Sequence, residues 1–127
     1  MNKKIAILDD HHIFRKGVIH LLKEEKKFDI IFESSSGVDF LQQAPLNEID
    51  ILLLDISLKD LSGISILKEL NEKNFLGKTV ILSMFDEKEY GLQSIQYGAA
   101  GYLTKSIVCE ELIDCLNAIS SNKLYIS

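Results

Sequence analysis

The sequence predicts an α/β fold in which an open parallel sheet is covered by helices on both faces. Five short apolar segments alternate with five segments whose apolar residues recur at the helical period. The apolar segments are continuous rather than alternating, which is typical of strands buried on both faces of a parallel sheet. The connections are short, and 127 residues suffice for one core but not for two ordinary domains. We therefore expect a single three-layer domain.

The first two repeats are expected near the N-terminus. The apolar run 5–8 should form a strand that stops at two acidic residues, and residues 13–22 carry apolar side chains at helical spacing before a charged exit. A second apolar segment, 28–33, is followed by the stretch 36–39, which resembles a helix capping box with Asp in the acidic position. The helix that it opens should end before Pro45, the only proline.

The third and fourth repeats occupy the middle of the chain. The run 49–54 is the most hydrophobic and is therefore the expected central strand. Residues 64–70 form the next helical stripe, and 79–82 the next strand. Acidic residues after that strand suit the positive end of a helix dipole, and this helix should turn Leu92 and Ile95 inward.

The fifth repeat closes the predicted domain, with a strand at 100–104 and a helix at 110–120. Val108 stands where a capping residue is expected, so the start of this helix should be poorly capped. Cys115 shares the spacing of the apolar residues around it and is expected in the core. Cys109 and Cys115 are too few cysteines for a disulfide framework, and their spacing is not that of metal ligands.

Composition excludes several classes of function. A net charge of −5 and an isoelectric point near 5.1 argue against this chain binding nucleic acid or an anionic membrane by itself. No apolar run approaches the roughly 20 residues of a membrane span, and the N-terminal run is too short for a signal peptide. We expect a cytoplasmic protein in which any DNA contact needs another domain.

Polar side chains end four of the five predicted strands. They are Asp9 with Asp10, Asp55, Ser83 and Lys105. Because parallel strands bring their carboxyl ends to one edge of the sheet, these groups should converge in a crevice there. Three carboxylates would repel one another unless a cation lay among them, and Mg²⁺, which prefers oxygen ligands and phosphate, fits best.

This set of residues suits phosphoryl transfer. An aspartate is already ionised at pH 7, so Asp55 needs no general base to attack phosphorus, only relief from charge repulsion. The metal and Lys105 would neutralise the transferring group, and Ser83 could donate a hydrogen bond to one of its oxygens.

Four motifs together resemble the receiver domain of two-component response regulators, over nearly the whole chain. They are residues 7–11, 52–57, 81–85 and 101–105. The resemblance implies a flavodoxin-like (βα)5 fold with a five-stranded parallel sheet in the order 2-1-3-4-5. It also implies a signalling switch that takes a phosphoryl group from a histidine kinase and slowly hydrolyses it, rather than an enzyme acting on other substrates.

The same resemblance implies a role for each site residue. Asp55 would be phosphorylated and would bind Mg²⁺ together with Asp10 and the main-chain carbonyl of Ser57, with Asp9 acting through water. Ser83 and Tyr102 would form a switch pair, in which the hydroxyl moves toward the phosphoryl group and the ring turns inward.

Residues 9–17 and 82–84 are most similar to the NarL/LuxR-type subgroup, whose receivers usually precede a helix-turn-helix domain. Residues 1–121 are therefore expected to form the receiver, and 122–127 to begin a linker toward an output domain outside this chain. The resemblance also makes a homodimer a candidate, through the fourth helix with the strand and helix after it, or through the first and fifth helices.

Two departures from the family pattern keep another interpretation open. Lys59 replaces a common proline beside Asp55, and Ser106 replaces the proline after Lys105, so the family's cis peptide there is an open question, although Lys105 should still point into the crevice. They favour the alternative of an interaction module that works without phosphorylation. A flavodoxin-like cofactor binder is a third hypothesis, disfavoured because no phosphate-cradling hydroxyl and glycine run follows the first strand. The three histidines are assigned no chemistry: His11, His12 and His20.

Overall fold

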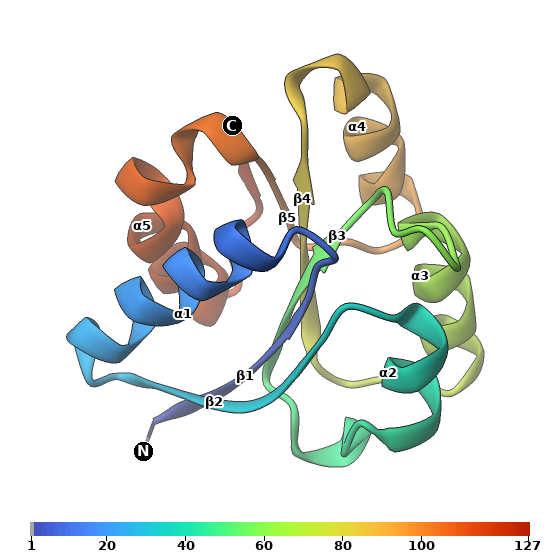
Figure 1. Cartoon of the computed structure of the whole chain (residues 1–127), viewed down its shortest axis with the longest axis horizontal. Helices are drawn as coiled ribbons and strands as arrows, with labels where there is room; N and C mark the ends of the chain where they lie inside the picture. Colours follow the sequence, from blue (N-terminus) through green and yellow to red (C-terminus); the bar gives the residue numbers. More distant parts are fainter. Residues whose placement is uncertain (1) are drawn as a thin grey trace.

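A computed structural model describes residues 2–127 as a six-stranded parallel sheet with five α-helices (Figure 1). The strands are β1 (Lys3–Leu8), β2 (Phe28–Ser34), β3 (Ile51–Asp55), β4 (Lys78–Ser83), β5 (Gly101–Thr104) and β6 (Tyr125–Ile126). The helices are α1 (His12–Glu25), α2 (Gly37–Gln43), α3 (Gly63–Glu72), α4 (Lys88–Gln96) and α5 (Val108–Ser120). Three short 3-10 helices are η1 (Leu46–Glu48), η2 (Phe85–Glu87) and η3 (Lys105–Ile107).

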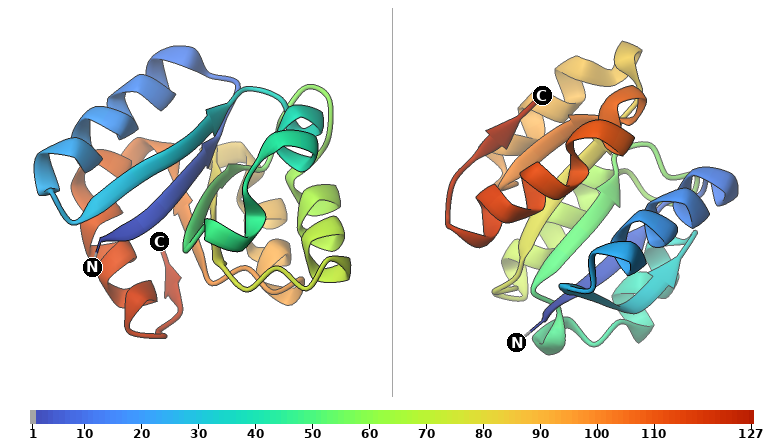
Figure 2. Two further views of the ribbon diagram at one scale, coloured as in Figure 1. Left: turned by 90° about the horizontal axis from the view of Figure 1, so that it is seen from below. Right: turned by 90° about the vertical axis from the view of Figure 1, so that its left-hand side faces the viewer.

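The sheet order is β2-β1-β3-β4-β5-β6, so the predicted order of the first five strands is confirmed. Helices α1 and α5 cover one face, and α2, α3 and α4 cover the other, which gives the three predicted layers (Figures 1 and 2). Alternate residues of one strand enter the two cores: Leu53 packs on the α1 and α5 side, and Leu52 and Leu54 on the opposite side. All three are fully buried, as expected of a central strand.

Several local predictions are confirmed. The Ser36 hydroxyl accepts a hydrogen bond from the Asp39 amide at 3.1 Å, and α2 ends at Gln43, before Pro45. No side chain caps the start of α5, and Cys115 is fully buried.

The sixth strand was not predicted. Tyr125 and Ile126 pair with β5 inside the stretch that was expected to start a linker, and the Ser127 amide donates to the Tyr102 carbonyl at 2.9 Å. Without this pairing β5 would be the edge of the sheet, with unpaired backbone groups. The pairing is decided by the return of the chain from α5, which no local pattern reveals.

The expected inward orientation of Leu92 is wrong, because 39% of this side chain is exposed. Helix α4 instead buries Gly91 and Ser94 against the sheet. The reason lies in Tyr102, whose ring occupies the space that a Cβ atom at position 91 would need. A large neighbour on the sheet thus selects the small face of the helix. Ile13 is also exposed, at the start of the predicted stripe of α1. The expectation for Ile95 is confirmed, since Ile95 packs against the core on the α4 side of the sheet.

The Lys105–Ser106 peptide is trans, as are all the peptide bonds that the structure describes. Within residues 2–127, no helix has the length and apolarity required to cross a membrane.

Candidate functional site

The polar strand ends meet at one edge of the sheet, above the centre in Figure 1. Strands β1 and β3 are neighbours in register, Leu8 beside Leu54, so Asp9 and Asp55 emerge side by side. Asp55 itself pairs with Leu82 of β4, whose next residue is Ser83. The side chains that the sequence placed in a crevice are therefore brought together by the order β1-β3-β4.

Asp9, Asp10 and Asp55 form the floor of the crevice. One carboxylate oxygen of each, together with a ring nitrogen of His11, lies within 4.8 Å of all the others. Asp9 and Asp55 are buried, with exposed fractions of 0% and 1%, and the Asp10 side chain is 10% exposed. Like charges this close in a poorly solvated place repel one another strongly.

Lys105 supplies the positive charge inside the crevice, as predicted. Its ammonium lies 3.0 Å from Asp9 Oδ2 and 3.3 Å from Asp55 Oδ2, and its side chain is 7% exposed. The ammonium also sits 4.8 Å from the centre of the Phe14 ring, a cation–π arrangement that holds it over the acidic floor.

Burial raises the pKa of Asp55 to about 6 from an ordinary 3.8. The Ser57 amide, which donates to Asp55 Oδ1 at 3.0 Å, lowers that pKa; the charge of Asp9 raises it, and Lys105 lowers it again. Asp55 is thus mostly ionised at pH 7, yet its charge is poorly compensated. A carboxylate in this condition gains from a further cation.

Asp9 carries the clearest sign of an incomplete site. Its Oδ1 accepts from the His11 amide at 2.8 Å, but its Oδ2 is fully buried and receives no well-oriented hydrogen bond. The 3.0 Å approach of Lys105 to Oδ2 is an ionic contact without hydrogen-bond alignment, so it satisfies the charge only in part. An orphaned carboxylate oxygen beside two other carboxylates fits a hard divalent cation such as Mg²⁺.

The β3–α3 loop that carries Ser57 is anchored by Asp60, a residue that the sequence reasoning missed. The Asp60 carboxylate accepts hydrogen bonds from the amides of Gly37 and Val38, each at 3.0 Å, from the Ser36 hydroxyl at 2.7 Å and from the Leu61 amide at 2.9 Å. These bonds, that of Val38 first, hold the pKa of Asp60 at about 2. The loop is therefore tied to the start of α2 without the proline that Lys59 replaces.

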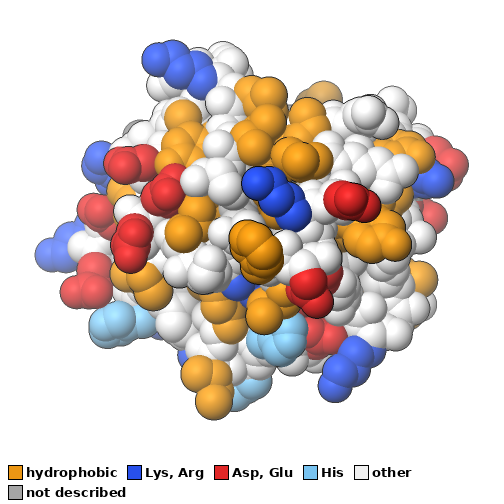
Figure 3. All heavy atoms as spheres, turned by 90° about the horizontal axis from the view of Figure 1, so that it is seen from above, with side chains coloured by type: hydrophobic (Ala, Val, Ile, Leu, Met, Phe, Trp, Pro, Cys, Tyr) orange, Lys and Arg blue, Asp and Glu red, His pale blue; other side chains and the backbone are white. Residues whose placement is uncertain are grey.

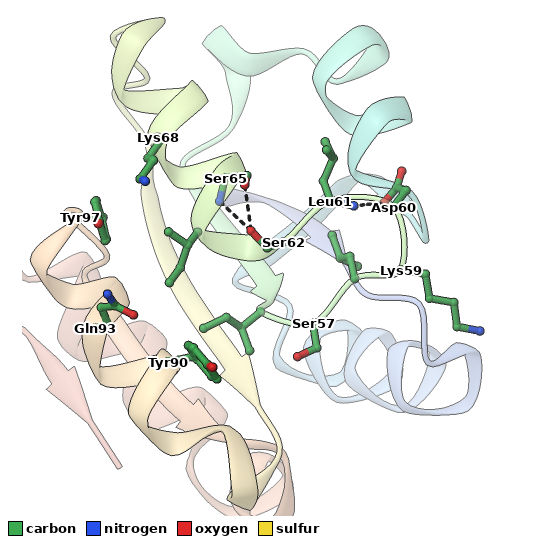
Figure 4. Close-up of a pocket in the computed structure, with 13 residues that line it drawn as sticks. Ser57, Lys59, Asp60, Leu61, Ser62, Ser65, Lys68, Tyr90, Gln93 and Tyr97 are labelled. Atoms are coloured by element: carbon green, nitrogen blue, oxygen red, sulfur yellow. Dashed lines mark hydrogen bonds between the residues drawn. The ribbon is translucent and has the colours of Figure 1, made fainter.

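A groove of about 600 Å³ adjoins the crevice between α3 and α4, lined by Tyr90 and Tyr97 on one side and Ser62 on the other (Figure 4). Lys59 extends away from these tyrosines (Figure 4). The groove is a neighbour of the acidic crevice rather than part of it, since Ser57 alone of the predicted site residues lines it.

Ser83 and Tyr102 are in contact. The Ser83 hydroxyl donates to the Tyr102 hydroxyl at 3.1 Å, and both residues are fully buried. The ring of Tyr102 thus already lies inside in this structure, packed on Gly91.

His11 belongs to the crevice, although the sequence analysis treated it as a surface residue without chemistry. Its Nδ1 lies 2.6 Å from the Lys105 ammonium and 3.3 Å from Asp9 Oδ1. The other two histidines contact different residues, His12 the guanidinium of Arg15 and His20 the carboxylate of Glu24. The signal was its position directly after Asp9 and Asp10, ahead of the first turn of α1.

Comparison with known proteins decides the family. A sequence model described as a response regulator receiver domain matches residues 5–117. The chain belongs to this family. The receiver is 28% identical to the transcriptional regulatory protein DegU of Brevibacillus brevis over 123 residues, which cover 97% of this chain and 52% of DegU. It is also 28% identical to the nitrate/nitrite response regulator NarL of Escherichia coli K12, over 97% of this chain and 57% of NarL.

These relatives place the receiver among the NarL/LuxR-type response regulators. The crystal structure of the non-phosphorylated receiver domain of RcsB from Escherichia coli superposes with a TM-score of 0.90, covering 100% of this chain and 99% of that one at 19% identity. That likeness shows the same fold. The chain spans about half the length of the curated relatives that it matches.

Proposed function

We propose that this receiver is the phosphorylation-controlled switch of a two-component system and that Asp55 accepts the phosphoryl group. The observation that supports this most directly is the pairing of a buried, ionised Asp55 with Lys105 at 3.3 Å, beside two further carboxylates. A nucleophile and a fixed cation at this spacing suit transfer of an anionic group.

Asp10, Asp55 and the carbonyl of Ser57 are the residues that would hold Mg²⁺, with Asp9 acting through water. When bound, the ion would add positive charge beside the transferring phosphoryl group. The orphaned Oδ2 of Asp9 and the mutual repulsion of the carboxylates support this assignment.

The transfer itself asks little of the protein beyond position and charge. A carboxylate oxygen of Asp55 forms a bond to phosphorus while the bond from phosphorus to the kinase histidine nitrogen breaks, and that nitrogen keeps the electron pair. The Lys105 ammonium compensates charge on the phosphoryl oxygens. Ser83 is the hydroxyl donor for one of them, and in donating it exchanges Tyr102 for the phosphoryl group.

This exchange is the proposed link to partners. Tyr102 packs on Gly91 of α4, so loss of the hydrogen bond from Ser83 alters the contact between β5 and α4. The altered surface would then bind a second receiver, forming a homodimer, or an output domain. The candidate surfaces are that of α4, β5 and α5 and that of α1 and α5. RcsB has been solved as two dimers bound to DNA. We propose DNA regulation here through an attached domain, not through this acidic receiver.

A histidine kinase is the proposed phosphodonor. Three exposed apolar residues lie close to the crevice, on α1 and around the start of η2: Ile13 at 87%, Met84 at 47% and Phe85 at 79%. Figure 3, which looks onto this end of the molecule, shows hydrophobic side chains among histidine and acidic groups. Such a rim suits docking of an apolar helix face beside Asp55.

Incubation with acetyl phosphate and Mg²⁺ tests the proposal. Intact-mass analysis should show one added phosphoryl group on the wild type, none on Asp55→Asn and none without Mg²⁺. Asp86→Asn, a change of an exposed aspartate outside the crevice, is the matched control and should be phosphorylated like the wild type. Absence of phosphate on the wild type, with partner binding intact, would favour the interaction module that works without phosphorylation.

A further inference from the structure

The imidazole of His11 turns a nitrogen lone pair toward the acidic crevice. Its Nδ1 lies 2.6 Å from the Lys105 ammonium, which carries only donor hydrogens. A contact of this length between the two is a hydrogen bond only if Nδ1 accepts. In this contact the His11 ring accepts through Nδ1, which is also the nitrogen that would face a metal ion in the crevice.

The spacing of this nitrogen suits a shared ion. Nδ1 lies 3.3 Å from Asp9 Oδ1 and 3.7 Å from both Asp10 Oδ1 and Asp55 Oδ2. Octahedral coordination with bonds of about 2.1 Å places neighbouring ligand atoms about 3 Å apart and opposite ones about 4.2 Å apart. The separations from Asp10 and Asp55, the proposed ligands, exceed the distance between neighbouring ligands by about 0.7 Å, a shift that a half-exposed ring can make.

Apart from its contact with Lys105, the His11 ring has no structural role in capping α1. His11 is the residue before the first turn of α1, where a side chain often caps the helix, yet its side chain makes no capping hydrogen bond. Half of the side chain, 55%, is exposed, so the ring has room to adjust. The Lys105 ammonium contacts His11, Asp9 and Asp55 at once, so the ring nitrogen and the carboxylates already face a shared positive charge.

We infer that His11 is a further metal ligand and gives the crevice a mixed nitrogen and oxygen donor set. This inference rests on the proposed metal site of Asp10 and Asp55. Carboxylate and carbonyl oxygens suit Mg²⁺, whereas an imidazole nitrogen favours later first-row ions such as Co²⁺, Ni²⁺ and Zn²⁺. The site should therefore bind Ni²⁺ more tightly than Mg²⁺, by a margin that depends on His11.

Calorimetric titration with Mg²⁺ and with Ni²⁺ tests the preference on the whole chain. His11→Ala should weaken Ni²⁺ binding about tenfold or more, the scale seen when the surroundings of a metal are disturbed, and weaken Mg²⁺ binding much less. His20→Ala is the matched control, because His20 lies on α1 beside Glu24 and away from the crevice, and could itself collect Ni²⁺. It should leave the ratio of the two affinities unchanged at the crevice.

A spectroscopic measurement identifies the ligand directly. Pulsed electron paramagnetic resonance of the Mn²⁺-loaded protein should show coupling to an imidazole nitrogen in the wild type and in His20→Ala, and none in His11→Ala. Bound Mn²⁺ without nitrogen coupling, or an equal loss of Ni²⁺ and Mg²⁺ affinity in His11→Ala, would overturn the inference and leave the proposed function standing. Failure of the wild type to bind any of these ions would instead count against the metal site of the proposed function.

Discussion

Two aspartates at opposite ends of the β3–α3 loop experience contrasting environments. Asp55 is buried in the crevice, where burial raises its pKa to about 6. Asp60 lies at the surface, where four hydrogen-bond donors from the start of α2 and from its own loop hold its pKa at about 2. The fold thus disfavours the charge of Asp55 and favours the charge of Asp60, although the two residues lie within six residues of chain.

Under the proposed function, the contrast separates a phosphate-accepting carboxylate from one that supports the fold. Asp60 stabilises the loop because every donor around it is paired, as in a helix cap. Asp55 costs stability because its charge is desolvated and incompletely paired. Under the proposed function, the same condition makes it receptive to a cation and a phosphoryl group. The anchored loop holds Ser57 beside the strained carboxylate, so the stable region supports the reactive one.

The largest effect is expected from removing the charge of Asp55. Because the pKa in the folded protein, about 6, lies above 3.8, the folded state holds the proton more tightly than the unfolded chain. The folded state is stabilised by this tighter proton binding. The stabilisation is complete below about pH 4 and is lost as the pH rises through about 6. Asp55→Asn should therefore raise the free energy of unfolding at pH 7 by about 1–3 kcal/mol without metal.

Urea unfolding followed by circular dichroism, with a chelator present, measures this difference. The wild type and Asp55→Asn should converge near pH 4, where the wild-type carboxyl is protonated. A mutant that is less stable than the wild type at pH 7 would show that the ion pair with Lys105 outweighs desolvation, and would remove the contrast between the two aspartates.

The opposite sign is expected at Asp60. Asp60→Ala should lower the free energy of unfolding by about 1 kcal/mol at pH 7, the usual cost of losing a cap, with solvent exposure limiting the electrostatic part. Since the pKa is lowered in the folded state, the contribution is present above about pH 4 and disappears as the pH falls toward about 2. The deficit of the mutant should shrink over that window. Asp86→Ala, at an exposed position, is the control and should show no such pH dependence.

Magnesium should stabilise the protein through Asp55 and not through the exposed Asp86. At ten times its dissociation constant, Mg²⁺ should stabilise the wild type by about 1.4 kcal/mol, because it binds the folded state. Asp55→Asn should lose most of this gain, while Asp86→Asn should keep it. Thermal melts with and without Mg²⁺ provide the measurement, and equal stabilisation of all three proteins would place the ion outside the crevice.

The smallest effect is expected from Lys59, which lies between the two aspartates. Lys59→Ala should change the free energy of unfolding by less than about 0.5 kcal/mol, because the side chain is exposed and Asp60 already anchors the loop. The rate of phosphorylation by acetyl phosphate should stay close to that of the wild type. A marked change in that rate would show that the cation at this position acts on the crevice.

Much of the fold was predictable because its signals are local. Continuous apolar runs marked the first five strands, and a hydroxyl three residues before an acid marked the start of α2. The orientation of Leu92 was wrong because the shape of Tyr102, a distant residue in the chain, decides which face of α4 is buried. The strand β6 was missed because its partner, β5, lies about 20 residues earlier.

By itself the sequence determined the order of strands and helices along the chain and the polar residue that ends each central strand, because helical and strand periodicities are properties of neighbouring residues. Tertiary structure alone decided that His11 joins Lys105 in the crevice and that Asp60 binds the start of α2 rather than joining the proposed metal site. Both outcomes depend on which loops the sheet order places side by side and on how deeply each carboxylate is buried. The loops come together, and the carboxylates lose water, only when the strands pair.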